Sequence, residues 1–175
     1  MKLAQDFKIK SIRFIVGLIV LVIMSIVLDK IFFTNKTFHW LAQFGLGGLF
    51  FLIGISLPAI SGRQLKMNGR SLDKNLPRGT TDKLVIVGLY KELRHPAFQG
   101  FWFLLFGIGL LMNSYTFVFL LAPVASAYIF YFALVKEEQE AFEKFSCDYE
   151  YYRRDVPAFF PKLLFGWTLK EKFKC

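Results

Sequence analysis

The stretch from His95 to Val135 reads HPAFQGFWFLLFGIGLLMNSYTFVFLLAPVASAYIFYFALV and contains no Asp, Glu, Lys or Arg in 41 residues. A bilayer core about 30 Å thick is crossed by roughly 20 apolar residues in a helix. At about 1.5 Å per residue, one helix of this length would be about twice as long as the bilayer is thick. The polar interruption is Met112-Asn113-Ser114-Tyr115. We therefore predict two antiparallel helices, 96–112 and 115–135, joined by a tight turn.

Two earlier apolar runs indicate further spans. Residues 14–28 and 37–62 also lack Asp, Glu, Lys and Arg, and they predict spans at about 13–33 and 38–60. The sequence thus predicts an all-α integral membrane protein with about four transmembrane helices, the last two forming a tight hairpin. We expect one membrane domain over residues 1–175.

The composition agrees with a membrane protein. Apolar residues make up 55% of the chain, and charged residues make up 20%, against about 25% in ordinary globular proteins. This pattern excludes intrinsic disorder, a collagen-like fold and a disulfide scaffold.

The basic residues predict the topology. Of the 22 Lys and Arg residues, 20 lie in the N-terminal tail, in the segment 61–95 and from residue 136 onward, and only Lys30 and Lys36 lie elsewhere. The positive-inside rule places both termini and the middle segment in the cytoplasm, on the plasma membrane if the source is prokaryotic. The net charge of +9 then reflects topology and attraction to anionic membrane lipid. We expect no nucleic-acid partner.

The segment 82–100 contains the first candidate site residues. Residues 83–90 form a short extended apolar stretch, and His95 is predicted to be the N-cap of a helix that starts at Pro96. The free amides and the positive end of a helix N-terminus favour an anion. Gly100 leaves room for a ligand or another backbone to approach closely. From the residues alone, a basic interfacial anchor with an ordinary proline start fits equally well.

The segment 136–162 contains the second group. Glu137 and Glu138 follow the fourth span, where acidic residues oppose the helix dipole and require a partner. A cytoplasmic amphipathic helix is predicted over 139–155, with one aromatic face. This face consists of Phe142, Phe145, Tyr149 and Tyr152. The spacing favours a core or interfacial stripe over a cofactor site. Neither cysteine has a second Cys or His at metal-ligand spacing, so we expect no metal.

The order of motifs over residues 82–162 resembles the isoprenylcysteine carboxyl methyltransferase and phospholipid methyltransferase superfamily. The matching motifs are Lys83-Leu-Val, Gly88-Leu-Tyr90, Arg94-His-Pro-Ala-Phe98, Gly100, Glu137-Glu138, Phe145, Tyr149, Tyr152 and Val156-Pro-Ala-Phe-Phe-Pro161. The resemblance implies an integral membrane enzyme that binds S-adenosylmethionine without a Rossmann fold, at the cytoplasmic end of the bundle. It implies methyl transfer to a lipophilic acceptor: an isoprenylcysteine carboxylate, a phospholipid amine or another small membrane-soluble or lipidated substrate.

The resemblance also implies site residues. Those expected to bind the cofactor are Lys83, Leu84, Val85, Tyr90, His95, Pro96, Ala97, Phe98, Gly100, Glu137 and Glu138. The backbone of 83–85 would contact the adenine edge, and His95 with the following amides would contact the cofactor carboxylate. Glu137 would bind the cofactor ammonium or ribose. The catalytic residues stay unassigned, with His95 and Glu137 as the best candidates.

Three positions depart from the superfamily pattern. Phe98 stands where tyrosine is usual, Ser146 stands where glycine is usual, and residues 131–135 lack the arginine that the isoprenylcysteine enzymes carry. An unpaired buried carboxylate is costly, so the missing arginine favours a neutral or amine-bearing acceptor. Two alternatives remain: an NADPH-dependent membrane reductase of the sterol-reductase type, and a non-catalytic membrane protein of the same fold.

Overall fold

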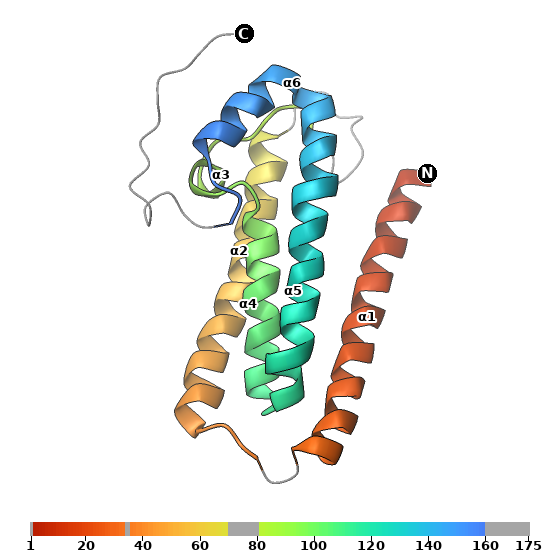
Figure 1. Ribbon diagram of the computed structural model, residues 1–175. Helices are drawn as coiled ribbons and strands as arrows, with labels where there is room; N and C mark the ends of the chain where they lie inside the picture. The colour runs from red at the N-terminus through yellow and green to blue at the C-terminus, as the bar shows by residue number, and fades with distance from the viewer. Residues whose placement is uncertain (1, 34–35, 70–80, 160–175) are drawn as a thin grey trace. The chain divides into compact units, whose positions relative to one another are not determined.

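The computed structural model describes residues 2–33, 36–69 and 81–159, with side chains from residue 16 onward apart from residue 18. Within these ranges every regular element is a helix (Figure 1), which confirms the predicted all-α fold. In chain order the helices are α1 Lys2–Phe32, η1 Leu41–Leu46, α2 Gly47–Asn68, α3 Leu89–Glu92, α4 Pro96–Leu111, η2 Phe117–Leu121, α5 Ala122–Tyr131, η3 Phe132–Glu137 and α6 Glu138–Asp155. The η segments are π-helical and continue into the helices that follow them.

Two helices in the described part of the chain are long and apolar enough to cross a membrane. They are Leu41–Asn68, with 28 residues, and Phe117–Asp155, with 39 residues, while α4 is apolar but shorter. Only 17% and 28% of the apolar windows in the two long helices are buried. A core helix of a soluble protein would be mostly buried, so this exposed apolar surface favours contact with lipid.

The last long helix differs from its prediction. The span 115–135 and the helix 139–155 were expected as separate elements, but the helix continues from Phe117 through α5 and η3 into α6 without a break at residues 136–138. Its conformation is interrupted further on, inside α6 at Ser146. The physical reason is that no glycine or proline lies between residues 124 and 156, so nothing in that part of the sequence ends the helix.

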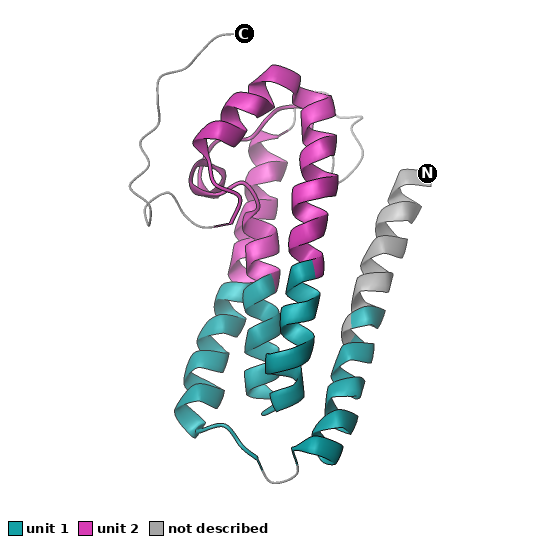
Figure 2. Ribbon diagram, viewed as in Figure 1, with its two compact units in different colours: residues 1–54, 102–127 teal, residues 55–101, 128–175 magenta. Residues whose placement is uncertain are grey.

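The contacts divide the chain into two compact units (Figure 2). Unit 1 comprises residues 1–54 and 102–127, and unit 2 comprises residues 55–101 and 128–175. The helices α2, α4 and α5 each contribute residues to both units. Every residue that was expected to bind a cofactor belongs to unit 2.

In unit 1, close packing between α2 and α4 depends on glycine. A Cβ atom built on Gly54 would lie 2.6 Å from the backbone of Leu104, and one on Gly107 would lie 2.6 Å from the backbone nitrogen of Phe51. Small residues that let helix backbones approach are common where membrane helices pack. Any larger residue at these two positions would force the helices apart.

The predicted tight turn lies at residues 112–114 of unit 1. Asn113 has a φ of 57°, and the amides of Asn113 and Ser114 donate to the carbonyls of Leu110 and Gly109 at 2.9 and 3.0 Å. This is the bonding pattern of a Schellman motif, in which asparagine tolerates the left-handed conformation. The Asp29 carboxylate of α1 accepts a 2.8 Å hydrogen bond from the Thr116 amide, which caps the next helix.

Candidate functional site

Unit 2 contains a cavity of about 230 Å³ between the ends of its helices. It is lined by Leu65 of α2, by Thr81, Lys83, Leu84 and Val85 of the following segment, by Tyr90 of α3, by Arg94, His95, Pro96, Ala97 and Phe98 around the start of α4, and by Glu137, Ala141, Phe145, Tyr149 and Tyr152 of η3 and α6. The lining combines apolar side chains with a few charged groups, as small-molecule sites commonly do.

Nine of the eleven residues that were expected to bind a cofactor line this one cavity. The two that do not are Gly100 and Glu138. Gly100 faces α2, where an added Cβ would lie 2.4 Å from Cδ of Pro58, so its role is close helix packing. Glu138 is buried among the basic residues beside the cavity.

The start of α4 places His95 at the cavity. Its carbonyl accepts a 3.1 Å hydrogen bond from the Gln99 amide, which makes His95 the N-cap, as predicted. The amides of Arg94 and His95 donate to the carbonyls of Pro157 and Ala158 at 2.9 and 3.0 Å. The segment after α6 therefore occupies these two amides. An anionic ligand could therefore bind only the side chains at this helix start and the backbone amides that follow Pro96.

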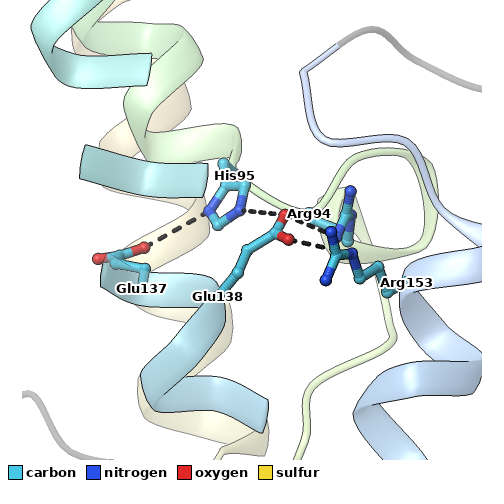
Figure 3. Close-up of polar contacts among 5 residues, drawn as sticks. All are labelled: Arg94, His95, Glu137, Glu138 and Arg153. Carbon is cyan, nitrogen blue, oxygen red and sulfur yellow. Dashed lines mark hydrogen bonds and ion pairs between the residues drawn. The ribbon is translucent and has the colours of Figure 1, made fainter. Parts of the chain in front are cut away.

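A network of charged side chains lies beside the cavity (Figure 3). His95 Nδ1 is 3.4 Å from Glu137 Oε2, and His95 Nε2 is 3.3 Å from Glu138 Oε1. Arg94 Nη1 lies 2.6 Å from Glu138 Oε1, and Arg153 Nε lies 3.2 Å from Glu138 Oε2. Glu138 thus has three basic partners, whereas Glu137 has its ion pair with His95 alone among the described residues.

The network determines the ionisation of its members. Burial opposes the charge on Glu138, whose side chain is 3% exposed, but the hydrogen bond from His95 and the charges of Arg94 and Arg153 outweigh burial and lower its pKa. Burial likewise opposes the charge on His95, yet its hydrogen bonds to Glu137 and Glu138 raise its pKa. Glu138 is therefore ionised at neutral pH, and His95 holds its proton more tightly than a free imidazole does.

The second half of α6 supplies the opposite wall. Tyr149, Tyr152 and Val156 form a buried cluster, against which Leu84, Ala141 and Phe145 pack. The Tyr152 hydroxyl donates a 2.7 Å hydrogen bond to the carbonyl of Tyr90. Burial raises the pKa of Tyr90 and of Tyr152, so the hydroxyls of both side chains stay protonated.

The predicted aromatic face is therefore divided between two environments. Phe145, Tyr149 and Tyr152 line the cavity, while Phe142 is 49% exposed. The face was expected to be mainly a core or interfacial stripe, and three of its four members also form the wall of the candidate site.

A family model described as protein of unknown function, DUF1295, matches residues 3–156. The chain belongs to the DUF1295 family. The match includes every residue that lines the cavity and all five members of the charged network. A search of curated proteins finds no match.

Two site residues of this DUF1295 protein were missed from the sequence. Arg94 lines the cavity and contacts Glu138, and its place directly before His95-Pro96 was an available signal. Arg153 had no such signal. It lies 15 residues after Glu138, which in a straight helix is a rise of about 22 Å.

A bend in α6 brings Arg153 to Glu138. Ser146 has a φ of 46° and a ψ of −118°, which interrupts the helical conformation inside α6. No group of three or more potential metal-ligating residues occurs in the part of this DUF1295 chain that the structure describes.

Proposed function

We propose that this protein transfers a methyl group from S-adenosylmethionine to a lipophilic acceptor at the cytoplasmic face of a membrane. One observation supports this most directly. Nine of the residues that the superfamily resemblance assigns to the cofactor line one cavity of unit 2. These residues come from segments far apart in the sequence, at 83–98 and at residue 137.

The chemistry of the lining fits the proposed cofactor. An amino-acid group carries a carboxylate and an ammonium, and the cavity offers the basic side chains of Arg94 and His95 beside the carboxylate of Glu137. Leu84, Val85 and Phe145 give apolar surface for a flat ring. The Glu137 side chain is 44% exposed, so its carboxylate is accessible to a ligand, unlike that of Glu138.

Each group then has a distinct part. Arg94 and His95 would hold the cofactor carboxylate, Glu137 its ammonium, and Leu84 with Val85 its adenine ring. When bound, the cofactor supplies an electrophilic methyl group. The protein contributes orientation of the reactants and exclusion of water, and the tyrosines of α6 cover the cavity on one side.

The membrane arrangement belongs to the same proposal. Four spans, at about 13–33, 38–60, 96–112 and 115–135, place both termini and the segment 61–95 in the cytoplasm. The cavity residues then lie at the cytoplasmic ends of the spans. An acceptor dissolved in the lipid can reach them without crossing water.

The charged network supports a neutral or amine-bearing acceptor. Arg153 is the arginine of α6 that lies near the site, but it pairs with Glu138 and does not replace the arginine missing from 131–135. Arg94 pairs with the same carboxylate, and its remaining binding capacity is assigned to the cofactor in this proposal. Beside His95 lie the rings of Phe98 and Phe159, at centroid distances of 5.9 and 5.6 Å, and Phe132 is 6.3 Å from Phe98. This apolar surface suits a lipophilic group.

Calorimetry on the detergent-purified protein tests the cofactor. We expect S-adenosylmethionine to bind and NADPH not to bind. Preferential binding of NADPH would replace this proposal by the membrane reductase, and binding of neither would favour the non-catalytic protein. With binding established, labelled cofactor and membrane lipid extract test the acceptor beside a prenylated cysteine analogue. Strong labelling of the analogue as a base-labile methyl ester, with none in lipid, would reject the acceptor preference.

A further inference from the structure

α6 consists of two helical pieces joined at Ser146. Residues 138–145 continue the helix of η3, and the direction changes before the second piece, residues 147–155 (Figure 1). The φ of 46° and ψ of −118° at Ser146 belong to a region that side chains other than glycine rarely adopt. Gly88 adopts nearly the same conformation, with φ 61° and ψ −127°. The bend is thus held at a residue that does not favour it.

Two polar contacts hold the bent piece in place, in addition to the buried cluster of Tyr149, Tyr152 and Val156. Arg153 Nε lies 3.2 Å from Glu138 Oε2, and this contact spans the bend because a straight helix would separate the two residues by about 22 Å. The Tyr152 hydroxyl bonds to the Tyr90 carbonyl. Both contacts exist only while the second piece lies against the rest of the site.

The bent piece forms one wall of a partly open cavity that is small for the proposed ligand. Tyr149 and Tyr152 of this piece are part of the lining, and the volume is about 230 Å³. Pockets for small organic ligands are roughly 300–1,000 Å³. Widening the cavity requires one of its walls to move, and residues 147–155 form the wall attached through the bend.

We propose that residues 147–155 are a lid over the cavity, hinged at Ser146, and that Arg153 is a positioning residue that holds the lid closed. This proposal depends on the proposed function in one respect, namely that a small molecule binds in the cavity. It does not depend on which molecule that is. Opening breaks the Arg153–Glu138 ion pair and the Tyr152–Tyr90 hydrogen bond, and it exposes side chains of the buried cluster that Tyr149 and Tyr152 form.

The ion pair is suited to opening and closing. The Arg153 side chain is 59% exposed, so water solvates its charge when the lid opens. Glu138 then keeps Arg94 and His95 as partners, and no buried carboxylate is left unpaired. Arg154 is the matched control, since it is next in sequence and pairs with Glu150 on the same piece, so its contact does not cross the hinge.

Hydrogen exchange of the ligand-free protein in detergent tests the lid. In Arg153→Gln we expect the amides of 147–155 to exchange roughly two- to fivefold faster, the range for loss of an ion pair whose arginine is exposed and whose carboxylate keeps two other partners. Arg154→Gln should leave these rates unchanged, and Arg153→Lys should restore most of the protection. Equal effects of the two glutamine variants would overturn the proposal, as would faster exchange that extends through α4.

A second measurement separates the lid from the proposed function. In stopped-flow binding of S-adenosylmethionine, Arg153→Gln should raise the dissociation rate by a similar factor, while Arg154→Gln should not. An unchanged dissociation rate together with faster exchange would mean that the movement does not control access, which also overturns the proposal. If the wild-type protein binds no cofactor, the proposed function fails and the exchange measurement alone decides the lid.

Discussion

Replacement of Ser146 by glycine should stabilise the protein. A side chain held at a φ of 46° costs about 1–3 kcal/mol, and glycine loses about 0.5–1 kcal/mol more backbone entropy on folding than a residue with a side chain. The difference is a net gain of about 0.5–2 kcal/mol. Ser146 is exposed, so loss of its hydroxyl leaves no buried group unsatisfied.

Thermal unfolding in detergent measures this gain. For a chain of this size we expect the midpoint of Ser146→Gly to rise by roughly 1–8 °C. Ser146→Ala is the control, because it removes the hydroxyl but keeps the Cβ atom that causes the strain. A glycine in a regular helix destabilises by about 1 kcal/mol, so a lower midpoint for the glycine variant, or an equal rise in the alanine variant, would refute the strained bend.

The remaining predictions concern the charged network and the topology. Glu138→Gln leaves the buried Arg94 without its carboxylate and should destabilise the protein by about 3–5 kcal/mol, measured by unfolding. Glu137→Gln should destabilise it less, because Glu137 is half-exposed and pairs with His95 alone among the described residues. Glu137→Gln and His95→Ala should each weaken cofactor binding by roughly 10- to 150-fold while the protein stays folded in the membrane, and wild-type affinity in both would refute the site. The raised pKa of His95 gives stability that is complete below 6.5, the ordinary pKa of histidine, and is lost as pH rises through the folded pKa. The lowered pKa of Glu138 gives stability that is lost as pH falls below 4.5, the ordinary pKa of glutamate. The unfolding midpoint should therefore be highest between these two pH values, and His95→Gln should abolish the loss at higher pH. Reporter fusions at Lys36 and Lys74 should report opposite sides of the membrane, and the same side for both would contradict four spans.

Much of the fold follows from local signals in the sequence. Apolar runs predict helices because their length and lack of charge leave few alternatives, and the turn at Asn113 follows from a polar interruption too short for a loop. His95 could be assigned as an N-cap because Pro96 fixes where the helix starts. In each case the deciding information lies within a few residues of the feature.

The features that were not predicted depend on contacts distant in sequence or on an unfavourable local conformation. Residues 139–155 read as a regular amphipathic helix, and a serine gives no sign of a bend that glycine would have signalled. Without the bend, Arg153 could not be assigned to Glu138. The amides expected to contact a ligand follow His95, and nothing in the sequence indicated that the amides of Arg94 and His95 donate to the carbonyls of residues 157 and 158.

The strain at the hinge and the contacts of the lid act in opposite directions. Strain at Ser146 exists in the closed lid and is released if the residue returns to helical geometry on opening, so it favours opening. The ion pair of Arg153 and the hydrogen bond of Tyr152 favour closure. The ion pair, in which Arg153 is exposed, contributes about 1 kcal/mol, so strain of a similar size offsets it. The buried cluster of Tyr149, Tyr152 and Val156 keeps the closed state favoured. Ser146→Gly should therefore slow hydrogen exchange in 147–155, and adding it to Arg153→Gln should return the exchange rates toward those of the wild-type protein.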